Sequence, residues 1–463
     1  MQFNSLHFLF FLPIVTIFYY LLKNKWRWIL LFLASTYFYS VFFLPYILIL
    51  YAIILIDYTT GLLLDKWQNK TLRVTLLLVS ITSNLGLLAY FKYYNFFVDV
   101  FAPYYNNLHP IEIILPIGLS FHTFQSLSYI IEVYKRKQVA EKHIGYFANY
   151  VLFFPQMIAG PIERFSHLGN QFRLKHKFKY KNISQGLRLI LYGLFVKMCV
   201  ADNLAPLVNS FYQAPTTYFS SSAWVALIAF SIQIYADFYG YSTIAVGAAK
   251  MLDIHLMDNF KQPYFAVNLK EFWQRWHISL STWFRDYVFI PLGGSKVNTL
   301  RWIINIIIVF GLSGFWHGAN YTFIIWGLLH ATFYLLEALY HKIRPTTFTT
   351  SKTISFLGII LTFLLTTFIW VFFRSPNLTI AKQVILQCFQ YSFEATKQVH
   401  LPVSQMAMVL LFIIFEFLLI KNRFDVFLQS KNTHIRWVFY IILSVSILLF
   451  SGIQSFQFIY FQF

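Results

Sequence analysis

The stretch that decides the fold is WIINIIIVFGLSGFWHGANYTFIIWGLLHATFYLL, residues 302–336, which holds no Lys, Arg, Asp or Glu over 35 positions. An α-helix needs about 20 apolar residues to cross the hydrocarbon core of a bilayer, so this run is long enough to span twice. His317 lies in the middle of the run. An ionisable side chain is costly to place there and is by default a functional-site hypothesis, and imidazole exchanges protons near neutral pH.

The whole chain has the composition of a membrane protein. Apolar residues make up 58% of its 463 positions and charged residues only 11%, whereas a soluble protein needs far more charge to cover its surface. The other long uncharged runs are residues 74–91, 113–131, 207–236, 353–373, 398–415 and 437–463. The first apolar segment, 6–22, lacks the features of a cleavable signal, so we expect a retained helix. The sequence predicts an all-α integral membrane protein with about eleven transmembrane helices.

The net charge of +19 raises the question of nucleic-acid binding. The basic residues form no single patch; they punctuate the apolar runs, as at 66–73 and 164–188. That pattern is typical of cytoplasmic loops, so we expect membrane lipids and no nucleic acid as partners, with both chain ends outside. Cys199 and Cys388 have no metal or redox spacing, which favours core positions and predicts no metal site.

Two segments differ from simple spanning helices. Residues 146–162 are apolar but contain Pro155, Gly160 and Pro161, which favours a short re-entrant element. Residues 251–301 interleave charges with large aromatic side chains, which is typical of an interfacial or cytoplasmic element. The chain shows no internal repeat or soluble-domain boundary, so residues 1–463 are predicted to form one membrane domain.

Two histidines are candidates for chemistry, and each has a structural alternative. Membrane histidines also serve as interhelical hydrogen-bond partners, which is the alternative for His317. Gly314 and Gly318 clear side chains beside it, so that a ligand or another backbone can approach. His277 belongs to the predicted interfacial element, where a histidine costs little, so structural and functional interpretations are about equal. A second imidazole lets one ring take a proton while the other orients a partner.

Several strings carry a family resemblance. EFWQRWHISLSTWFRDY at 271–287, IPLGG at 290–294 and SGFWHG at 313–318 resemble membrane-bound O-acyltransferases. The resemblance is to the bacterial branch that exports acyl groups to envelope polymers, as in alginate and peptidoglycan O-acetylation. Shorter matches, LPIGLSF at 115–121, AGPIER at 159–164 and ADNL at 201–204, extend it over roughly residues 1–340.

The resemblance implies roles for particular residues. His317 matches the family's catalytic histidine and His277 its second site histidine. The implied donor is a cytoplasmic thioester, acetyl-CoA as a substrate, with no cofactor bound permanently. Arg275 and Arg285 are expected to meet its phosphates, and we place Trp316 and Asn320 in the donor site as well.

The segment YADFYGYST at 235–243 looks like the family's Asp-Phe-Ser-Gly-Tyr-Ser-Asp segment but departs from it at two positions. Tyr239 replaces the first Ser and Thr243 the final Asp. The acceptor polymer therefore stays open between alginate, peptidoglycan, teichoic acid and other exopolysaccharides. Asp237, in an apolar run, is expected to pair helices or orient a neighbour rather than act as a base.

The aromatic C-terminal tail, residues 456–463, has two interpretations. Composition favours an aromatic belt at the membrane interface. The tail also resembles a C-terminal motif of envelope-acylating systems whose tyrosine accepts the acyl group, which singles out Tyr460. A phenol has a pKa of about 10, so its ester is a better acyl donor than a sugar ester.

The sequence thus predicts a membrane O-acyltransferase of the bacterial inner membrane. It would pass an acetyl group via Tyr460 to an extracytoplasmic partner that O-acetylates an envelope polysaccharide; the resemblance implies an SGNH-type transferase with a Ser-His-Asp site. The alternative is a transporter or flippase with proton-relay histidines. That alternative predicts paired intramembrane carboxylates and a repeat, whereas only Asp57, Asp237 and Glu416 are plausible acids.

Overall fold

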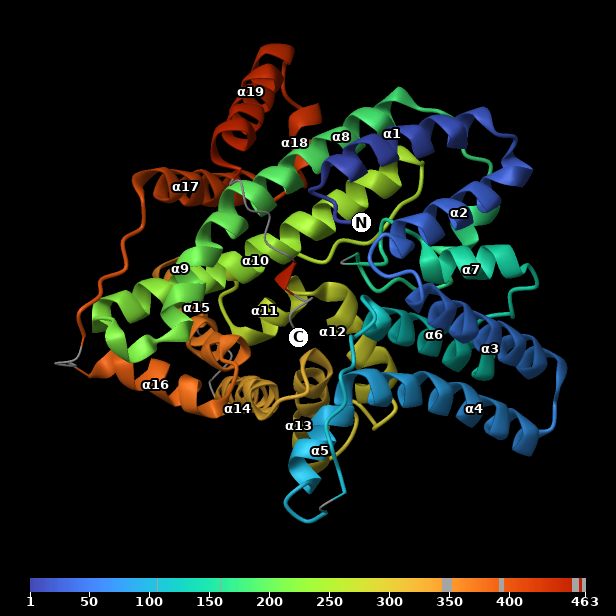
Figure 1. Ribbon diagram of the computed structural model, residues 1–463, viewed down its shortest axis with the longest axis horizontal. Helices are drawn as coiled ribbons and strands as arrows, with labels where there is room; N and C mark the ends of the chain where they lie inside the picture. Colours follow the sequence, from blue (N-terminus) through green and yellow to red (C-terminus); the bar gives the residue numbers. More distant parts are fainter. Residues whose placement is uncertain (106, 159, 344–351, 391–394, 452–457, 460–463) are drawn as a thin grey trace. The chain divides into compact units, whose positions relative to one another are not determined.

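The computed structural model describes the chain except for residues 106, 159, 344–351, 391–394, 452–457 and 460–463. The named elements of the described residues are all helical (Figure 1). The α-helices are α1 Leu6–Leu21, α2 Arg27–Ser40, α3 Tyr46–Lys66, α4 Lys70–Leu88, α5 Tyr94–Phe101, α6 Leu119–Tyr134, α7 Ile144–Leu152, α8 Tyr180–Leu194, α9 Asp202–Gln213, α10 Ser220–Met251, α11 Leu269–Arg275, α12 Ile278–Phe284, α13 Thr299–His317, α14 Tyr321–Ile343, α15 Lys352–Arg374, α16 Leu378–Phe389, α17 Val403–Leu418, α18 Phe424–Gln429 and α19 Thr433–Phe450.

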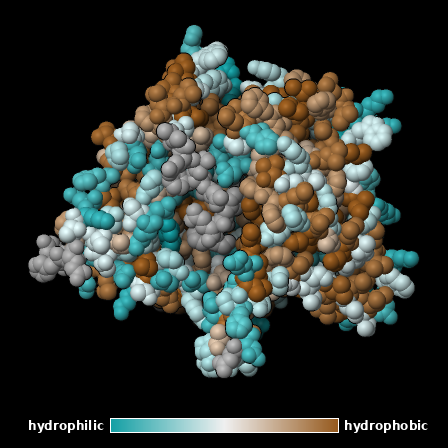
Figure 2. Space-filling view, viewed as in Figure 1, coloured by the Kyte–Doolittle hydropathy of each residue, from teal (hydrophilic) through white to brown (hydrophobic). Residues whose placement is uncertain are grey.

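The helices have the length and polarity of membrane spans. Within the described residues, eight stretches are long and apolar enough to cross a membrane, and α1, α16 and α17 are shorter apolar helices. The eight are Tyr46–Lys66, Lys70–Phe101, Tyr180–Gln213, Ser220–Met251, Thr299–His317, Tyr321–Tyr340, Lys352–Arg374 and Thr433–Phe450. Large apolar side chains are exposed on α3 and α4, among them Leu48, Leu55 and Leu78, and Figure 2 shows broad apolar areas on the surface. The predicted all-α membrane fold is confirmed.

The backbone contacts divide the chain into two compact units. Unit 1 comprises residues 1–190 and 242–257, and unit 2 comprises residues 191–241 and 258–463. Each unit thus combines segments that are distant in the sequence. The prediction that the whole chain acts as a single membrane domain stays a prediction.

In unit 1, α3, α4 and α6 pack against one another. The buried carboxylate of Asp57 on α3 accepts hydrogen bonds from Ser80 (2.5 Å) and Asn84 (2.9 Å) on α4. Helix α7 ends at Leu152, and the described residues from 153 to 163 form turns and extended chain. The helix thus stops before Pro155, and the predicted re-entrant element stays a prediction.

In unit 2, α13 and α14 form a hairpin held together by close backbone contact. A Cβ atom added at Gly314 would overlap the carbonyl oxygen of Phe323, and one added at Gly327 would overlap that of Phe310. Going forward along α13 from Phe310 to Gly314, the contacted residue of α14 moves backward from Gly327 to Phe323. The two helices therefore run in opposite directions. Gly314 therefore serves the approach of another backbone, one of the two uses expected of the glycines beside His317, while Gly318 makes room for the Phe323 ring.

The charged and aromatic stretch 251–301 is buried in its first half and more exposed in its second half. Its described part in unit 2 contains the two short helices α11 and α12, and Phe272, Trp276 and Leu280 are almost completely buried. Phe272, Trp276, Trp283 and Phe284 are buried in unit 2, while Trp273 and Tyr287 are partly exposed. Their location relative to a membrane surface stays a prediction.

Candidate functional site

His317 is the last residue of α13 and lies inside unit 2. Only 4% of its surface is exposed. Its ring packs against Trp326 at 5.1 Å and Phe373 at 5.2 Å between centroids. Gly318, in extended backbone, ends the helix directly after it. The uncharged run thus places this imidazole where α13 turns into α14, among aromatic rings.

His277 is fully buried between α11 and α12, whereas its expected position at a membrane interface stays a prediction. Its backbone is left-handed, with φ of 42° and ψ of 54°, a conformation that costs free energy for a residue with a side chain. The chain is held there because the Ile278 N–H donates to the Asn259 carbonyl (2.9 Å) and the Ser279 hydroxyl donates to the Asn259 side chain (2.6 Å). Burial lowers the pKa of His277 to about 3, so its ring is neutral at pH 7.

The structure brings the two histidines together. Their ring centroids lie 6.5 Å apart. The Trp316 ring lies 4.9 Å from the His317 ring and 6.3 Å from the His277 ring. The two imidazole rings therefore border the same apolar region, where hydrogen bonds and proton transfers act in a low dielectric.

A third histidine, His330 on α14, belongs to the same aromatic cluster. It is fully buried, and its ring lies 5.0 Å from both Trp326 and Trp273. Trp326 thus contacts both His330 and His317. The sequence analysis missed His330, although it lies in the same uncharged run and the argument made for His317 applies to it equally.

The C-terminal tail enters unit 2 beside His277. Phe458 and Ile459 are buried, and the Ile459 N–H donates a 2.7 Å hydrogen bond to Asp237 on α10. The Phe458 ring packs on Phe238, whose edge meets the His277 ring at 4.7 Å. This burial disagrees with an aromatic belt at a lipid interface for these two residues. Tyr460, the predicted acyl acceptor, lies outside the described residues.

The carboxylate that binds the tail is part of a buried charge cluster. The Lys197 ammonium lies 2.6 Å from Asp237 and 2.7 Å from Asp202. Asp237 therefore joins separate segments, as the sequence analysis expected of an orienting group. Lys197 and Asp202 were missed, although a lysine inside the apolar run 189–201 is itself a signal.

A cavity of about 440 Å³ opens in unit 2 beside the histidine cluster. Its walls include the aromatic residues Trp273 and Phe310, which also contact His330, and the cations Lys270 and Arg285. Of the four residues predicted to bind a donor, Arg285 is the one that lines this cavity.

The other three predicted donor residues have different surroundings. Arg275 forms an ion pair with Glu271. Asn320 caps the start of α14, accepting from the Thr322 N–H (3.0 Å) and donating to the Pro376 carbonyl (2.9 Å). Trp316 lies next to both histidines and does not line the cavity.

The acids that a transporter would need are occupied in helix pairing. Asp57 holds α3 to α4, and Asp237 binds Lys197 and the tail. Glu416 on α17 accepts a 2.5 Å hydrogen bond from the Tyr235 hydroxyl on α10. The described contacts pair none of these three with another of them, which disfavours the carboxylate relay of the transporter alternative.

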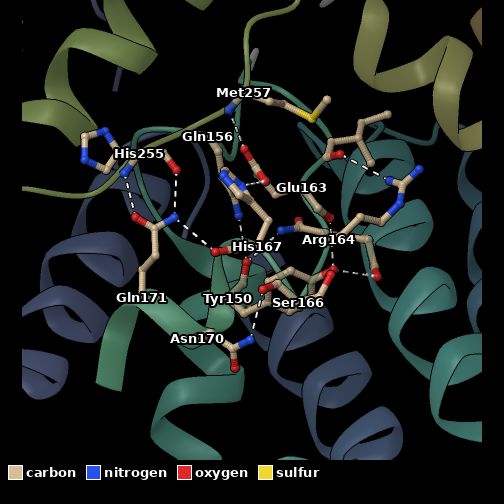
Figure 3. A network of polar contacts seen from close by, with 12 residues as sticks. Tyr150, Gln156, Glu163, Arg164, Ser166, His167, Asn170, Gln171, His255 and Met257 are labelled. Atoms are coloured by element: carbon tan, nitrogen blue, oxygen red, sulfur yellow. Dashed lines mark hydrogen bonds and ion pairs between the residues drawn. The ribbon is translucent and has the colours of Figure 1, made fainter. Parts of the chain in front are cut away.

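In unit 1, the AGPIER string forms a structural network (Figure 3). The buried Glu163 carboxylate lies 2.6 Å from His167 and accepts the Met257 N–H at 2.7 Å. Gln171 exchanges two 2.8 Å hydrogen bonds with the His255 backbone. These contacts tie the loop after α7 to the segment after α10.

Comparison with known proteins identifies the family of the chain. The family model for the membrane-bound O-acyltransferase family (MBOAT) matches residues 37–381. A probable alginate O-acetylase of Azotobacter vinelandii is 38% identical over 401 residues, covering 84% of this chain and 78% of that protein. The peptidoglycan O-acetyltransferase of Helicobacter pylori is 34% identical over 422 residues, covering 83% and 79%.

A more distant relative is the teichoic acid D-alanyltransferase of Bacillus subtilis, which is 30% identical over 235 residues, covering 48% of this chain and 58% of that protein. The matched region of the family model includes both histidines, the aromatic cluster between them and the cavity. Each of these relatives is named as a transferase of acyl groups. The chain belongs to the membrane-bound O-acyltransferase family and is a multi-pass membrane acyltransferase.

Proposed function

We propose that this enzyme takes an acetyl group from a cytoplasmic thioester and delivers it, through Tyr460, to an O-acetylation system for a polysaccharide of the bacterial envelope. The observation that carries the proposal is the course of the tail. Ile459, the residue before Tyr460, is bound to Asp237, and Phe458 contacts Phe238, which packs on His277. The chain thus brings its own C-terminal segment to the histidine pair.

The first transfer is a substitution at the thioester carbonyl. His317 removes the proton of the Tyr460 phenol while the phenolic oxygen attacks the carbonyl carbon. The carbon–sulfur bond breaks, and the departing thiolate takes the proton from the imidazolium. The products are an acetyl ester on Tyr460 and a free thiol. His277, neutral because burial lowers its pKa to about 3, orients a reacting group by hydrogen bonding.

The second transfer follows from the chemistry of the ester. A phenol is more acidic than a sugar hydroxyl, with a pKa of about 10, so phenolate is the better leaving group. The acyl group therefore keeps its transfer potential until a partner on the outer side moves it to a carbohydrate hydroxyl. An SGNH-type transferase is the proposed partner, and the cell inner membrane is the proposed location.

The cavity beside the histidines is the proposed donor site. Lys270 and Arg285 line it and supply positive charge for phosphate groups. Trp273 and Phe310, which also line it, contact the His330 ring. Acetyl-CoA is the donor we propose. The relatives named for alginate and for peptidoglycan support an envelope polysaccharide as the final acceptor.

Radiolabelled acetyl-CoA tests the relay directly. The detergent-purified enzyme is incubated with it, digested, and the C-terminal peptide is assayed for label. We expect label on this peptide in the wild type and none in Tyr460→Phe or His317→Ala. Tyr340→Phe, a change at an exposed tyrosine of α14, is the matched control and should label normally.

Two results would contradict the proposal. Label on the C-terminal peptide that persists in both Tyr460→Phe and His317→Ala would exclude the relay. Uptake of a substrate into proteoliposomes without any consumption of acetyl-CoA would instead favour a transporter.

A further inference from the structure

We infer that Asp237 is a positioning residue that seats the C-terminal tail, with Lys197 and Asp202 fixing its carboxylate for that purpose. The use of the seated tail as an acyl carrier rests on the proposed function, whereas the seating itself does not. None of these three residues lines the 440 Å³ cavity.

The contacts of Asp237 divide between the core and the tail. One carboxylate oxygen lies 2.6 Å from the Lys197 ammonium, and the other accepts the Ile459 N–H at 2.7 Å. Asp237 is 3% exposed and Lys197 is 1% exposed. The Asp237 carboxylate thus joins the buried Lys197 ammonium to the backbone of Ile459, which lies 222 positions after Asp237.

The charge balance of the cluster explains why the tail is needed. Lys197 is shared by Asp202 and Asp237, so one ammonium faces two carboxylates. Buried charges require partners, and a carboxylate oxygen left without a donor is costly. The Ile459 N–H supplies a donor to the oxygen of Asp237 that is turned away from Lys197. The tail therefore completes the cluster, in addition to packing on it.

The backbone around the cluster is built for close approach. Lys197 lies in a π-helical segment, Phe195–Ala201, between α8 and α9, and such segments often mark functional sites. Gly240, one turn after Asp237, lies against this segment. A Cβ atom at Gly240 would be 2.9 Å from both the Gly193 carbonyl oxygen and the Lys197 backbone nitrogen. Only a residue without a side chain lets α10 come near enough for the ion pair.

Further contacts hold the chain on both sides of the undescribed residues 452–457. Before them, the Asn203 side chain donates to the Phe450 carbonyl at 2.8 Å. After them, the Phe458 ring packs on Tyr241 at 4.8 Å and on Phe238 at 5.7 Å. The Asp237 hydrogen bond is the polar part of the second attachment. Since Tyr460 follows Ile459 directly, seating Ile459 determines where the tail continues.

The seating is tested with a buried thiol as a reporter. Ile459→Cys is introduced into a Cys199→Ala, Cys388→Ala background, and the rate of maleimide labelling is measured on the full-length enzyme in detergent. The 3% exposure of Ile459 predicts slow labelling. Adding Asp237→Ala should raise the rate at least tenfold, because it removes the acceptor. Adding Asp237→Asn should raise it less, because an acceptor oxygen remains while the charge is lost.

The controls separate the seating from general damage and from the chemistry. Asp57→Asn alters a carboxylate equally buried in unit 1, whose described partners are Ser80 and Asn84, and should leave the labelling rate unchanged. Tyr460→Phe should abolish acetylation of the tail yet leave the thiol protected.

Acetylation of the tail is measured in parallel, without the reporter substitutions. Asp237→Ala should lower the rate constant at least tenfold at saturating acetyl-CoA, with the half-saturating concentration unchanged, because the residue contacts the tail and not the cavity. A general structural defect would change both quantities.

Each outcome decides one of the two proposals. A protected thiol in both Asp237 variants overturns the seating role. An accessible thiol with unchanged acetylation supports the seating and overturns the Tyr460 relay. If Asp237→Ala fails to fold, the Asp237→Asn variant gives the decision, since it preserves the side-chain shape.

Discussion

Two histidines, His167 in unit 1 and His277 in unit 2, show how the same side chain is put to different uses. His167 is half-exposed and lies 2.6 Å from the Glu163 carboxylate, whose hydrogen bond raises the pKa of the imidazole. His277 is fully buried next to the Phe238 ring, and burial lowers its pKa to about 3. The two environments shift proton affinity in opposite directions.

The difference separates a structural histidine from a chemical one. His167 has a carboxylate partner within its own loop network, which favours the charged form and ties the loop down (Figure 3). His277 is held in a left-handed backbone among aromatic side chains and faces His317. A neutral imidazole kept at such a conformational cost is typical of functional sites.

The largest expected effect is on activity. His277→Asn should lower the rate of tail acetylation by about 10²-fold or more, within the range of general acid–base contributions. Asparagine tolerates the left-handed backbone, so the fold is preserved. His167→Ala should leave the rate within about threefold, since its described contacts lie in the unit 1 loop network. Equal losses in the two variants would remove the distinction between the histidines.

The next effect concerns the carboxylate that organises the unit 1 loop. Glu163→Ala should lower the free energy of unfolding by about 2–4 kcal/mol, because the part-buried Met257 N–H and the His167 ring lose their acceptor. Denaturant unfolding in detergent measures this. His167→Ala should cost less, since that ring is half in solvent; the reverse order would show that the network depends on the histidine.

A smaller effect tests the packing that positions His317. Gly314→Ala should cost about 1–3 kcal/mol, because the added methyl group overlaps the Phe323 carbonyl of α14. Gly86→Ala on α4 is the matched control, since a Cβ there meets nothing within 4 Å, and it should be neutral or stabilising by up to about 1 kcal/mol. Thermal unfolding of both variants, followed in parallel, measures the difference.

The last comparison is a pH dependence of opposite sign at the two histidines. Between pH 6.5 and about 3 the unfolded chain binds a proton at His277 that the folded chain excludes. Stability therefore falls with falling pH, by at most about 1.4 kcal/mol per pH unit. The contribution of His167, whose folded pKa is raised, is fully present below the unfolded pKa and is lost as pH rises through the folded pKa.

Matched variants separate the two contributions. Unfolding midpoints are measured from pH 5 to 8 for the wild type, His277→Asn and His167→Asn. We expect His277→Asn to flatten the acid side of the curve and His167→Asn to flatten the neutral-to-alkaline side. An unchanged acid slope in His277→Asn would mean that the His277 ring is accessible to protons in the folded enzyme.

The sequence by itself determined the all-helical membrane fold, because hydrophobic runs of spanning length leave a bilayer few other structures. It also singled out His317, since an ionisable group in an uncharged run is conspicuous without any knowledge of packing. The resemblance of the strings around His277 and His317 identified the family, which the comparisons confirmed.

Only the tertiary structure decided what surrounds these residues. Burial of His277, the contact of Trp326 with both His330 and His317, and the attachment of Ile459 to Asp237 join positions distant in the chain. Charges and aromatic side chains alternate in residues 251–301, and only the structure showed that Phe272, Trp276, Trp283 and Phe284 are buried. Periodicity reports which side of a helix is apolar; it does not report whether lipid or protein covers that side, because both are equally apolar solvents for a side chain.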